Sequence, residues 1–169
     1  MRRCLILLLT AIVLAGCAAP PVNPPLTQPA PTSLPSTAGE AQDALVDFLT
    51  LLHAGKYTQA VPLYGGDYEA LKVFNPEIDP NDPAALWRWS CDHQLLQCLE
   101  IRSVTFDQLV EDAYIFQVEF NNPDGSLFVL GPCCGATETE MPPVSQFQFT
   151  VIRNADGRLV VINTPPYVP

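Results

Sequence analysis

Four cysteines in the second half of the chain are the residues whose type and spacing point most directly to chemistry: Cys91, Cys98, Cys133 and Cys134. In an oxidising compartment an even number of thiols indicates disulfides first, and four cysteines allow three pairings. In a simple strand meander, Cys98 begins the first strand and the adjacent pair follows the third, at opposite ends of the sheet. This placement favours a local Cys91–Cys98 bond, with cross-links between the pairs and free thiols as alternatives.

Two other kinds of chemistry remain open at these cysteines. A bond between the neighbours Cys133 and Cys134 would be strained and easily reduced, which would suit a redox switch. Together with His93, the four cysteines also supply enough ligands for zinc, although their spacing matches no common zinc knuckle. A thiol or metal site therefore stands as an alternative to a structural role.

The usual signatures of catalysis are missing from the sequence. There is no Gly-x-Ser-x-Gly, no phosphate-binding loop and no His-Glu-x-x-His. Asp92 and His93 place a carboxylate beside an imidazole, but neighbours in sequence rarely face each other as a catalytic dyad. We assign no catalytic residue, metal ligand or cofactor, and a non-catalytic role is favoured over an enzyme.

The N-terminus has the composition of an export signal. Arg2 and Arg3 precede the apolar run 4–13, which is too short to span a bilayer as a permanent helix. The residues that follow, Leu14-Ala15-Gly16-Cys17, resemble the lipobox of bacterial lipoproteins. An ordinary cleaved signal or an uncleaved anchor is the alternative.

The lipobox resemblance implies a location and a modification. Residues 1–16 would be removed as a signal peptide, and Cys17 would become the first residue of the mature protein and carry acyl chains. The partner implied at this end is the membrane: the outer face of the cytoplasmic membrane, or an outer membrane if the cell has one. The cysteines of the domain would then lie outside the cytoplasm, where disulfides persist.

Residues 17–36 are predicted to be a linker. Seven prolines lie among small and polar residues between Ala18 and Pro35, without charge or helical periodicity. Proline-rich segments are extended at about 3.1 Å per residue, so this one could hold the following domain roughly 50 to 60 Å from the membrane. Residues 37–169 have the length of one domain.

The charge of the chain is strongly acidic. Eight Lys and Arg face 18 Asp and Glu, giving a net charge of −10, and loss of Arg2 and Arg3 with the signal would make it −12. Such a surface repels nucleic acid, so we expect no nucleic-acid partner. No Asp-x-Asp-x-Asp-Gly loop marks a calcium site.

The first half of the domain has the pattern of helices. Thr37 and Glu40 form a capping-box pattern ahead of apolar residues spaced i, i+3, i+4 and i+7, which are Ala41, Ala44, Leu45, Phe48, Leu49 and Leu52. Shorter helices are predicted over 56–64 and 67–74. Asp82 before Pro83 predicts the start of another, which continues to about Ser90.

From Cys98 the pattern changes to the alternation of strands. Strands are predicted from Leu99 to Phe106 and over 114–121, with a turn near 111–112 between them. The turn 122–125 leads into a third strand over 126–130. After a long loop, strands are predicted over 146–153 and 159–163.

Helices followed by a strand meander define an α+β domain with helices on one face of a curved antiparallel sheet. The segment from Leu52 to Tyr64, LHAGKYTQAVPLY, looks like the opening of NTF2-like (cystatin-like) domains, whose fold is a cone. The segments 147–152 and 156–161 are similar to their last hairpin. The cysteine segments 91–99 and 131–135 are not part of that pattern, which implies a distinct subfamily.

The resemblance to NTF2-like domains implies a cavity between sheet and helices. Members of that superfamily bind small apolar ligands there or, in some enzymes, place an Asp and a His for general acid–base work. The aromatic residues expected to line such a cavity, or to form plain core, are Tyr64, Tyr68, Trp87, Trp89 and Phe116. We therefore expect a lipid-anchored domain that binds a small apolar ligand or another envelope protein.

Overall fold

The structure is a computed structural model, and it describes residues 36–168. These residues belong to one compact unit, Ser33–Pro169. The predicted signal peptide, Cys17 and the linker up to residue 35 lie outside the described residues.

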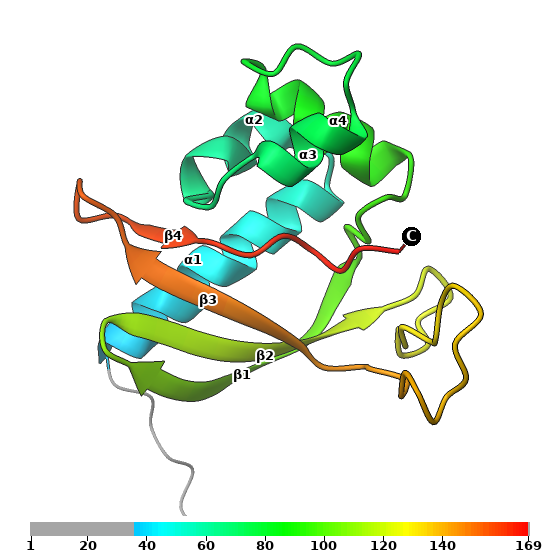
Figure 1. The fold of residues 1–169 in the computed structure, drawn as a ribbon. Coiled ribbons are helices and arrows are strands. Elements are labelled where there is room, and N and C mark those ends of the chain that lie inside the picture. Colours follow the sequence, from blue (N-terminus) through cyan, green and yellow to red (C-terminus); the bar gives the residue numbers. More distant parts are fainter. Residues whose placement is uncertain (1–35, 169) are drawn as a thin grey trace, which may run out of the picture. The chain divides into compact units, whose positions relative to one another are not determined.

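The described residues form the predicted α+β arrangement, with helices first and an antiparallel sheet after them (Figure 1). The sheet has four strands in the order β1-β2-β3-β4, so each strand pairs with its neighbour in sequence. The elements are α1 (Ser36–His53), α2 (Tyr57–Ala60), the 3-10 turn η1 (Val61–Leu63), α3 (Glu69–Phe74), α4 (Pro83–Asp92), β1 (Glu100–Val110), β2 (Ala113–Asn121), β3 (Phe147–Arg153) and β4 (Leu159–Val161).

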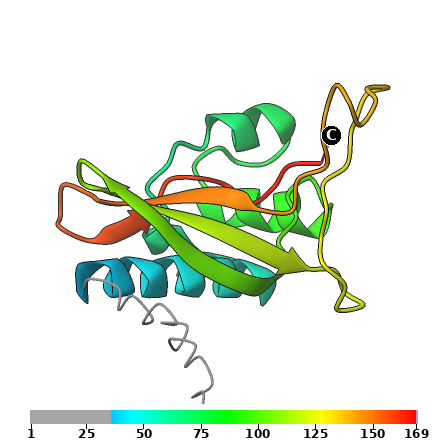
Figure 2. The ribbon, with the colours of Figure 1, turned by 90° about the horizontal axis from the view of Figure 1, so that it is seen from below.

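The first helix, α1, lies along one face of the sheet and packs against all four strands (Figure 2). The predicted apolar stripe is its buried face: Ala41, Leu45 and Phe48 are fully buried, while Asp43 and Asp47 are exposed. The helix ends at His53, and the chain turns at Gly55, whose φ of +68° disfavours any other residue type. The amphipathic pattern therefore determines both the position and the length of this helix.

Helix α4 begins where the sequence predicts. The Asp82 carboxylate accepts a hydrogen bond of 2.9 Å from the backbone N–H of Ala85, and Pro83 occupies the first helical position. The buried side of α4 carries Leu86, Trp87 and Ser90. Helices α2, α3 and α4 gather beyond β4, and α2 also packs against α1 (Figure 1).

The sheet has one apolar and one polar face. Phe116 on β2 lies opposite Phe106 on β1 and Phe149 on β3, so a row of rings faces α1. On the other face, the Ser103 hydroxyl donates a hydrogen bond of 3.0 Å to Glu119. The sheet is not closed on itself.

Strand β1 contains two irregularities that shift its register against β2. One lies between Ile101 and Ser103, and the other lies between Phe106 and Gln108. A bulge adds one residue to one strand and so changes which side chains face the core. Ile101 and Val104 are therefore both turned toward the core although they are three residues apart. This accounts for the imperfect alternation of the sequence in this segment.

The strand predicted over 126–130 is wrong. Only isolated bridges form there, Leu127 to Asn121 and Leu130 to Val144. Pro132, Pro142 and Pro143 flank this pairing, and a proline has no N–H to extend a ladder. The segment is part of the long loop between β2 and β3.

Candidate functional site

The structure joins Cys91 to Cys98 in a disulfide, with the two Cα atoms 5.5 Å apart. The bond ties the last turn of α4 to the residues just before β1 and closes a loop over seven positions. This is the local pairing favoured above. Its effect is to fix the entry into the sheet, because a short closed loop has few alternative conformations.

Cys133 and Cys134 remain thiols in the loop between β2 and β3. Their Sγ atoms lie 2.8 Å apart. The hydrogen bond between the two thiols raises the pKa of Cys133 above its usual value. Neither Cys133 nor Cys134 is cross-linked to the Cys91–Cys98 pair.

Three of the five aromatic residues predicted for a cavity pack together with Phe48 of α1. The Trp87 ring lies 5.6 Å from Phe48, 5.0 Å from Tyr64 and 6.0 Å from Tyr68, in edge-to-face contacts. The indole N–H of Trp87 donates a hydrogen bond of 3.2 Å to the Tyr68 hydroxyl. These rings fill the space between α1 and the other helices as packed core.

The other two aromatic residues lie apart from this cluster. Phe116 is fully buried on the sheet, where its ring contacts Phe106 at 5.7 Å. Trp89 is on the outer side of α4 and stacks on His93 at 3.7 Å. The five residues thus do not converge on one place.

Burial changes the acidity of the tyrosines in this part of the domain. Loss of hydration raises the pKa of Tyr57 to about 12, helped by the hydrogen bond of 2.7 Å that its hydroxyl donates to Asp92. Loss of hydration, with the nearby Asp67 carboxylate, also raises the pKa of Tyr64 to about 12. Both hydroxyls therefore stay protonated in the folded state well above the usual tyrosine pKa.

These pKa values predict an alkaline limit to stability. Unfolded tyrosines ionise near their ordinary pKa of 10.0, while folded Tyr57 and Tyr64 hold their protons until about pH 12. The folded state therefore binds more protons between these values, and the free energy of unfolding should fall as the pH rises from 10 to 12. Urea titrations at several pH values would measure this fall, and the Tyr57→Phe variant should show a shallower one. An identical slope in the variant would contradict the assignment.

The carboxylate and imidazole groups near the cysteines are each engaged in a separate contact. Asp92 accepts the hydrogen bond from Tyr57, and the Nδ1 atom of His93 lies 3.0 Å from the carbonyl oxygen of Trp89. The Nδ1 atom of His53 lies 3.1 Å from the carbonyl oxygen of Cys98. The neighbouring Asp92 and His93 do not act on each other as a dyad.

A wide polar hollow of about 470 Å³ lies between the end of α1 and the turn after β2. His53, Glu100 and Asp124 are among the residues around it. Glu100 accepts a hydrogen bond of 3.2 Å from Asn121, and Asp124 is bonded to Ser126. Each of these groups makes its own hydrogen bond within the surrounding backbone and side chains, and no shared hydrogen bond links them.

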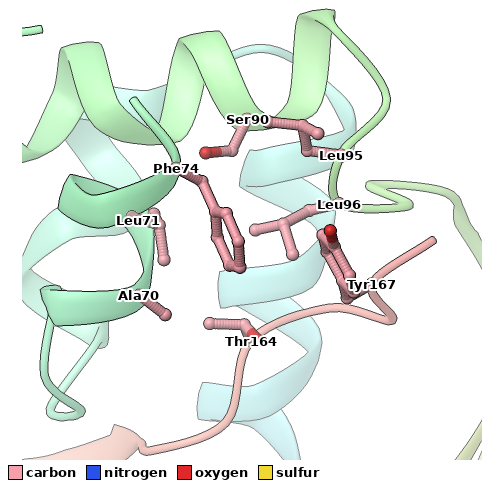
Figure 3. A pocket seen from close by; sticks show the side chains of 8 residues that line it. All are labelled: Ala70, Leu71, Phe74, Ser90, Leu95, Leu96, Thr164 and Tyr167. Atoms are coloured by element: carbon pink, nitrogen blue, oxygen red, sulfur yellow. The ribbon is translucent and has the colours of Figure 1, made fainter. Parts of the chain in front are cut away.

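An apolar pocket lies between α3, α4 and the C-terminal segment (Figure 3). Its volume is about 80 Å³, and its lining includes Phe74 and Tyr167, whose rings stack at 5.3 Å. Both rings are partly exposed, and Val73 beside them is 73% exposed. The residues that line the pocket are Ala70, Leu71, Phe74, Ser90, Leu95, Leu96, Thr164 and Tyr167.

The C-terminal segment is held at the pocket by backbone hydrogen bonds. Gln97 N–H donates to the carbonyl of Pro166 at 2.8 Å, and Val168 N–H donates to that of Leu95 at 3.1 Å. Tyr167 forms an antiparallel bridge with Leu96 between them. This pairing brings Tyr167 over α3, more than ninety residues earlier in the chain.

A buried polar group, Asn75, is hydrogen-bonded to Ser90 of the pocket lining. Asn75, 1% exposed, donates through its amide to the carbonyl of Leu71 at 2.6 Å and to the Ser90 hydroxyl at 3.3 Å. Its Oδ1 atom is buried and accepts no hydrogen bond from the described residues. Figure 3 shows the Ser90 hydroxyl on the α4 side of the pocket.

The sequence reasoning missed this pocket. Val73 and Phe74 gave one signal that could have indicated it. Adjacent apolar side chains at the end of a short helix, outside its buried face, indicate an exposed apolar patch. Tyr167 carried none, because its place depends on pairing between segments distant in sequence.

No protein-family model matches the chain, and no curated protein matches it significantly. Within residues 36–168, no helix is long and apolar enough to cross a membrane. The same described part of the chain holds no group of three or more His, Cys, Asp or Glu side chains placed to bind a metal ion.

Proposed function

We propose that this protein is a bacterial lipoprotein whose domain is a non-catalytic interaction module. The Leu14–Cys17 lipobox motif supports acylation at Cys17, export and an extracytoplasmic site on the membrane. Residues 17–36 then serve as the tether. The observation that carries the binding role is the apolar pocket whose lining includes the exposed Phe74–Tyr167 pair.

We also propose that the domain is a divergent NTF2-like cone. The order of helices before an antiparallel meander and the position of α1 across the sheet support this assignment. The aromatic cluster around Trp87 fills the interior where members of that superfamily have a cavity. The proposed binding site is therefore the pocket between α3 and the C-terminal segment, and not the interior between sheet and helices.

The size of the pocket supports a protein partner over a small ligand. Pockets that enclose whole drug-sized ligands have volumes of roughly 300 to 1,000 Å³. A volume of about 80 Å³ instead matches one aliphatic side chain. Side chains inserted into such pockets are typical anchors of protein–protein interfaces, and this favours an envelope protein over a free apolar ligand as the partner.

The charges around the pocket define the partner further. Glu77 and Asp79 are exposed in the loop that follows α3, while Glu69 on α3 is paired with Lys72 at 2.9 Å. Unpaired negative charges in the loop next to α3 favour positive charges on the partner. The partner segment is expected to present a leucine-sized side chain between Lys or Arg residues.

Two short peptides test this proposal on the full chain in detergent. The peptide acetyl-Arg-Leu-Arg-amide should shift the methyl NMR signals of Leu71, Leu95 and Leu96, with a Kd in the millimolar range. The matched peptide with alanine in place of leucine should bind about tenfold or more weakly, because it buries roughly three fewer carbon groups.

A substitution that fills the pocket provides the control. Ala70 is exposed on α3 and lines the pocket, so Ala70→Leu should block the leucine peptide without disturbing the core. Gln108→Leu, on the exposed end of β1, adds the same kind of side chain elsewhere and should leave binding unchanged. Equal binding of the two peptides, or normal binding by Ala70→Leu, would contradict the proposal.

A further inference from the structure

We propose that Cys133 and Cys134 form a site for thiol–disulfide exchange, at which an external disulfide oxidises the two neighbours to a bond with each other. Their Sγ atoms lie 2.8 Å apart in the loop between β2 and β3. A disulfide bond is about 2.05 Å long, so closure requires the two atoms to approach by less than about 1 Å. Within residues 36–168 no third free thiol competes for either of them.

The backbone of the loop brings the two adjacent thiols together. In an extended strand, neighbouring side chains point to opposite faces. Here Cys134 has a φ of +59° and Gly135 one of +87°, and Ala136 N–H donates to the carbonyl of Cys133 at 3.0 Å. A left-handed conformation is unfavourable for a residue with a side chain, and such residues cluster at functional sites. The turn therefore joins two thiols that an extended loop would separate.

Hydrogen bonds from the rest of the loop hold this turn. The backbone N–H of Cys133 donates to the Met141 sulfur at 3.5 Å, and Met141 N–H donates to the Thr137 carbonyl at 2.9 Å. At the base of the loop, Leu130 and Val144 exchange N–H to carbonyl bonds of 2.8 and 2.9 Å. None of these bonds uses a thiol, so all of them can persist while the two sulfur atoms react.

The two thiols differ in exposure and acidity, and this difference sets the order in which they react. Cys134 is exposed, whereas Cys133 is partly buried. The hydrogen bond with Cys134, together with loss of hydration, raises the pKa of Cys133. Since the thiolate is the nucleophile and must reach its target, Cys134 attacks the external disulfide first.

The exchange balances in two steps. The Cys134 thiolate attacks one sulfur of the external disulfide RSSR, forms a mixed disulfide and releases RS⁻. The Cys133 sulfur, after losing its proton, attacks the Cys134 sulfur, forms the bond between the neighbours and releases the second RS⁻. The two thiol protons end on the two RS⁻ groups, so RSSR is reduced to two RSH while the pair is oxidised.

The bond formed in this way is expected to be easily reduced. Adjacent Cα atoms are about 3.8 Å apart across a trans peptide, which is less than the roughly 4.4 to 6.8 Å of ordinary disulfides. The Cα atoms of Cys91 and Cys98 are 5.5 Å apart, within the ordinary range. Strained and exposed disulfides are the labile ones, so the adjacent pair should open and close under conditions that leave the Cys91–Cys98 bond intact.

The equilibrium is measured on the full chain in detergent, without oxygen, in buffers that contain reduced glutathione and glutathione disulfide. After acid quenching and alkylation, mass spectrometry of the digested chain reports each cysteine pair separately. With more glutathione disulfide, the adjacent pair should change from two alkylated thiols to a bonded peptide about 2 Da lighter than the dithiol. Half of it should be oxidised at a proportion of glutathione disulfide on the order of 100-fold or more above that for Cys91–Cys98, the internal control.

Substitution of one thiol should stop the exchange at the mixed disulfide. Cys133→Ser keeps the attacking thiol but removes the one that resolves the mixed disulfide, so one glutathione per chain should accumulate on Cys134. The parent chain should accumulate no adduct, because the neighbouring thiol displaces the glutathione. Cys134→Ser should form its adduct roughly threefold or more slowly than Cys133→Ser, because Cys133 is less exposed.

Two glycines of the loop give a matched pair of variants that keep both thiols. Gly135→Ala places a side chain at a φ of +87°, which a Cβ atom disfavours, so closure should slow about fivefold or more. Gly131→Ala adds the same methyl group at a residue without a left-handed φ and with no other group within 4 Å, and it should close as the parent does. Equal rates in the two variants would contradict the role of the turn.

Three results would overturn the proposal. The first is alkylation of both thiols at every proportion of glutathione disulfide. The second is a glutathione adduct that persists on the parent chain as it does on Cys133→Ser. The third is a bond from Cys133 or Cys134 to another cysteine, including one of a second chain, in place of the bond between the neighbours.

Discussion

Replacement of Trp87 with alanine is expected to lower the free energy of unfolding by about 3 to 5 kcal/mol, the usual cost of removing a large aromatic side chain from a core. Trp87 is fully buried, and its ring contacts those of Phe48, Tyr64 and Tyr68. The substitution would leave a cavity between α1 and α4 and would also deprive the Tyr68 hydroxyl of its donor. Within the described residues, the Phe48–Trp87 pair is the aromatic contact between α1 and α4.

The neighbouring tryptophan is the matched control. Trp89 is partly exposed and stacks on His93 at the outer side of α4, so Trp89→Ala should cost only about 1 kcal/mol. Urea unfolding followed by circular dichroism would measure both variants against the parent chain. Equal losses for the two substitutions would show that the cluster around Trp87 is not the centre of the core.

Helix α1 and the two central strands could be predicted because each is amphipathic over its whole length. In α1 the apolar residues recur every three or four positions, and in β2 Phe116, Val118 and Phe120 recur every second position. An amphipathic element can be predicted from its own sequence, because the prediction requires only that one of its faces is buried. Burial of these faces against each other then produces the order of layers.

The predictions fail where the local structure depends on pairing between segments that are distant in sequence. Residues 126–130 are apolar enough for a strand, but the prolines around them leave only isolated bridges. In β1 the register depends on bulges that no alternation can reveal, since the extra residue is defined only by the partner strand. These are properties of the pair and not of either segment alone.

The candidate site was less predictable than the fold for the same reason. The five aromatic residues singled out for a cavity carry the hydrophobic surface that a core needs, and three of them pack together as core. The pocket instead combines α3 with a C-terminal tyrosine that arrives through backbone bonds to residues 95–97. Residue type indicates burial, but it does not indicate which buried groups leave space between them.

The Cys17→Ser substitution is expected to release the protein completely from the membrane. Each acyl methylene buried in a bilayer contributes about 0.8 kcal/mol, and more than one chain is needed for stable attachment. Serine has no thiol for the acyl linkage, so all of this free energy would be lost.

Fractionation of cells and incorporation of labelled fatty acid would measure this release, with Cys4→Ser as the matched control. Cys4 lies in the segment predicted to be removed, so its substitution should leave both acylation and membrane partitioning unchanged. Unchanged partitioning of Cys17→Ser would refute the lipoprotein proposal, whereas peptide binding at the Phe74–Tyr167 pocket would be unaffected by that outcome. The anchor and the binding site are therefore separately testable, because one resides in the first 17 residues and the other in the folded domain.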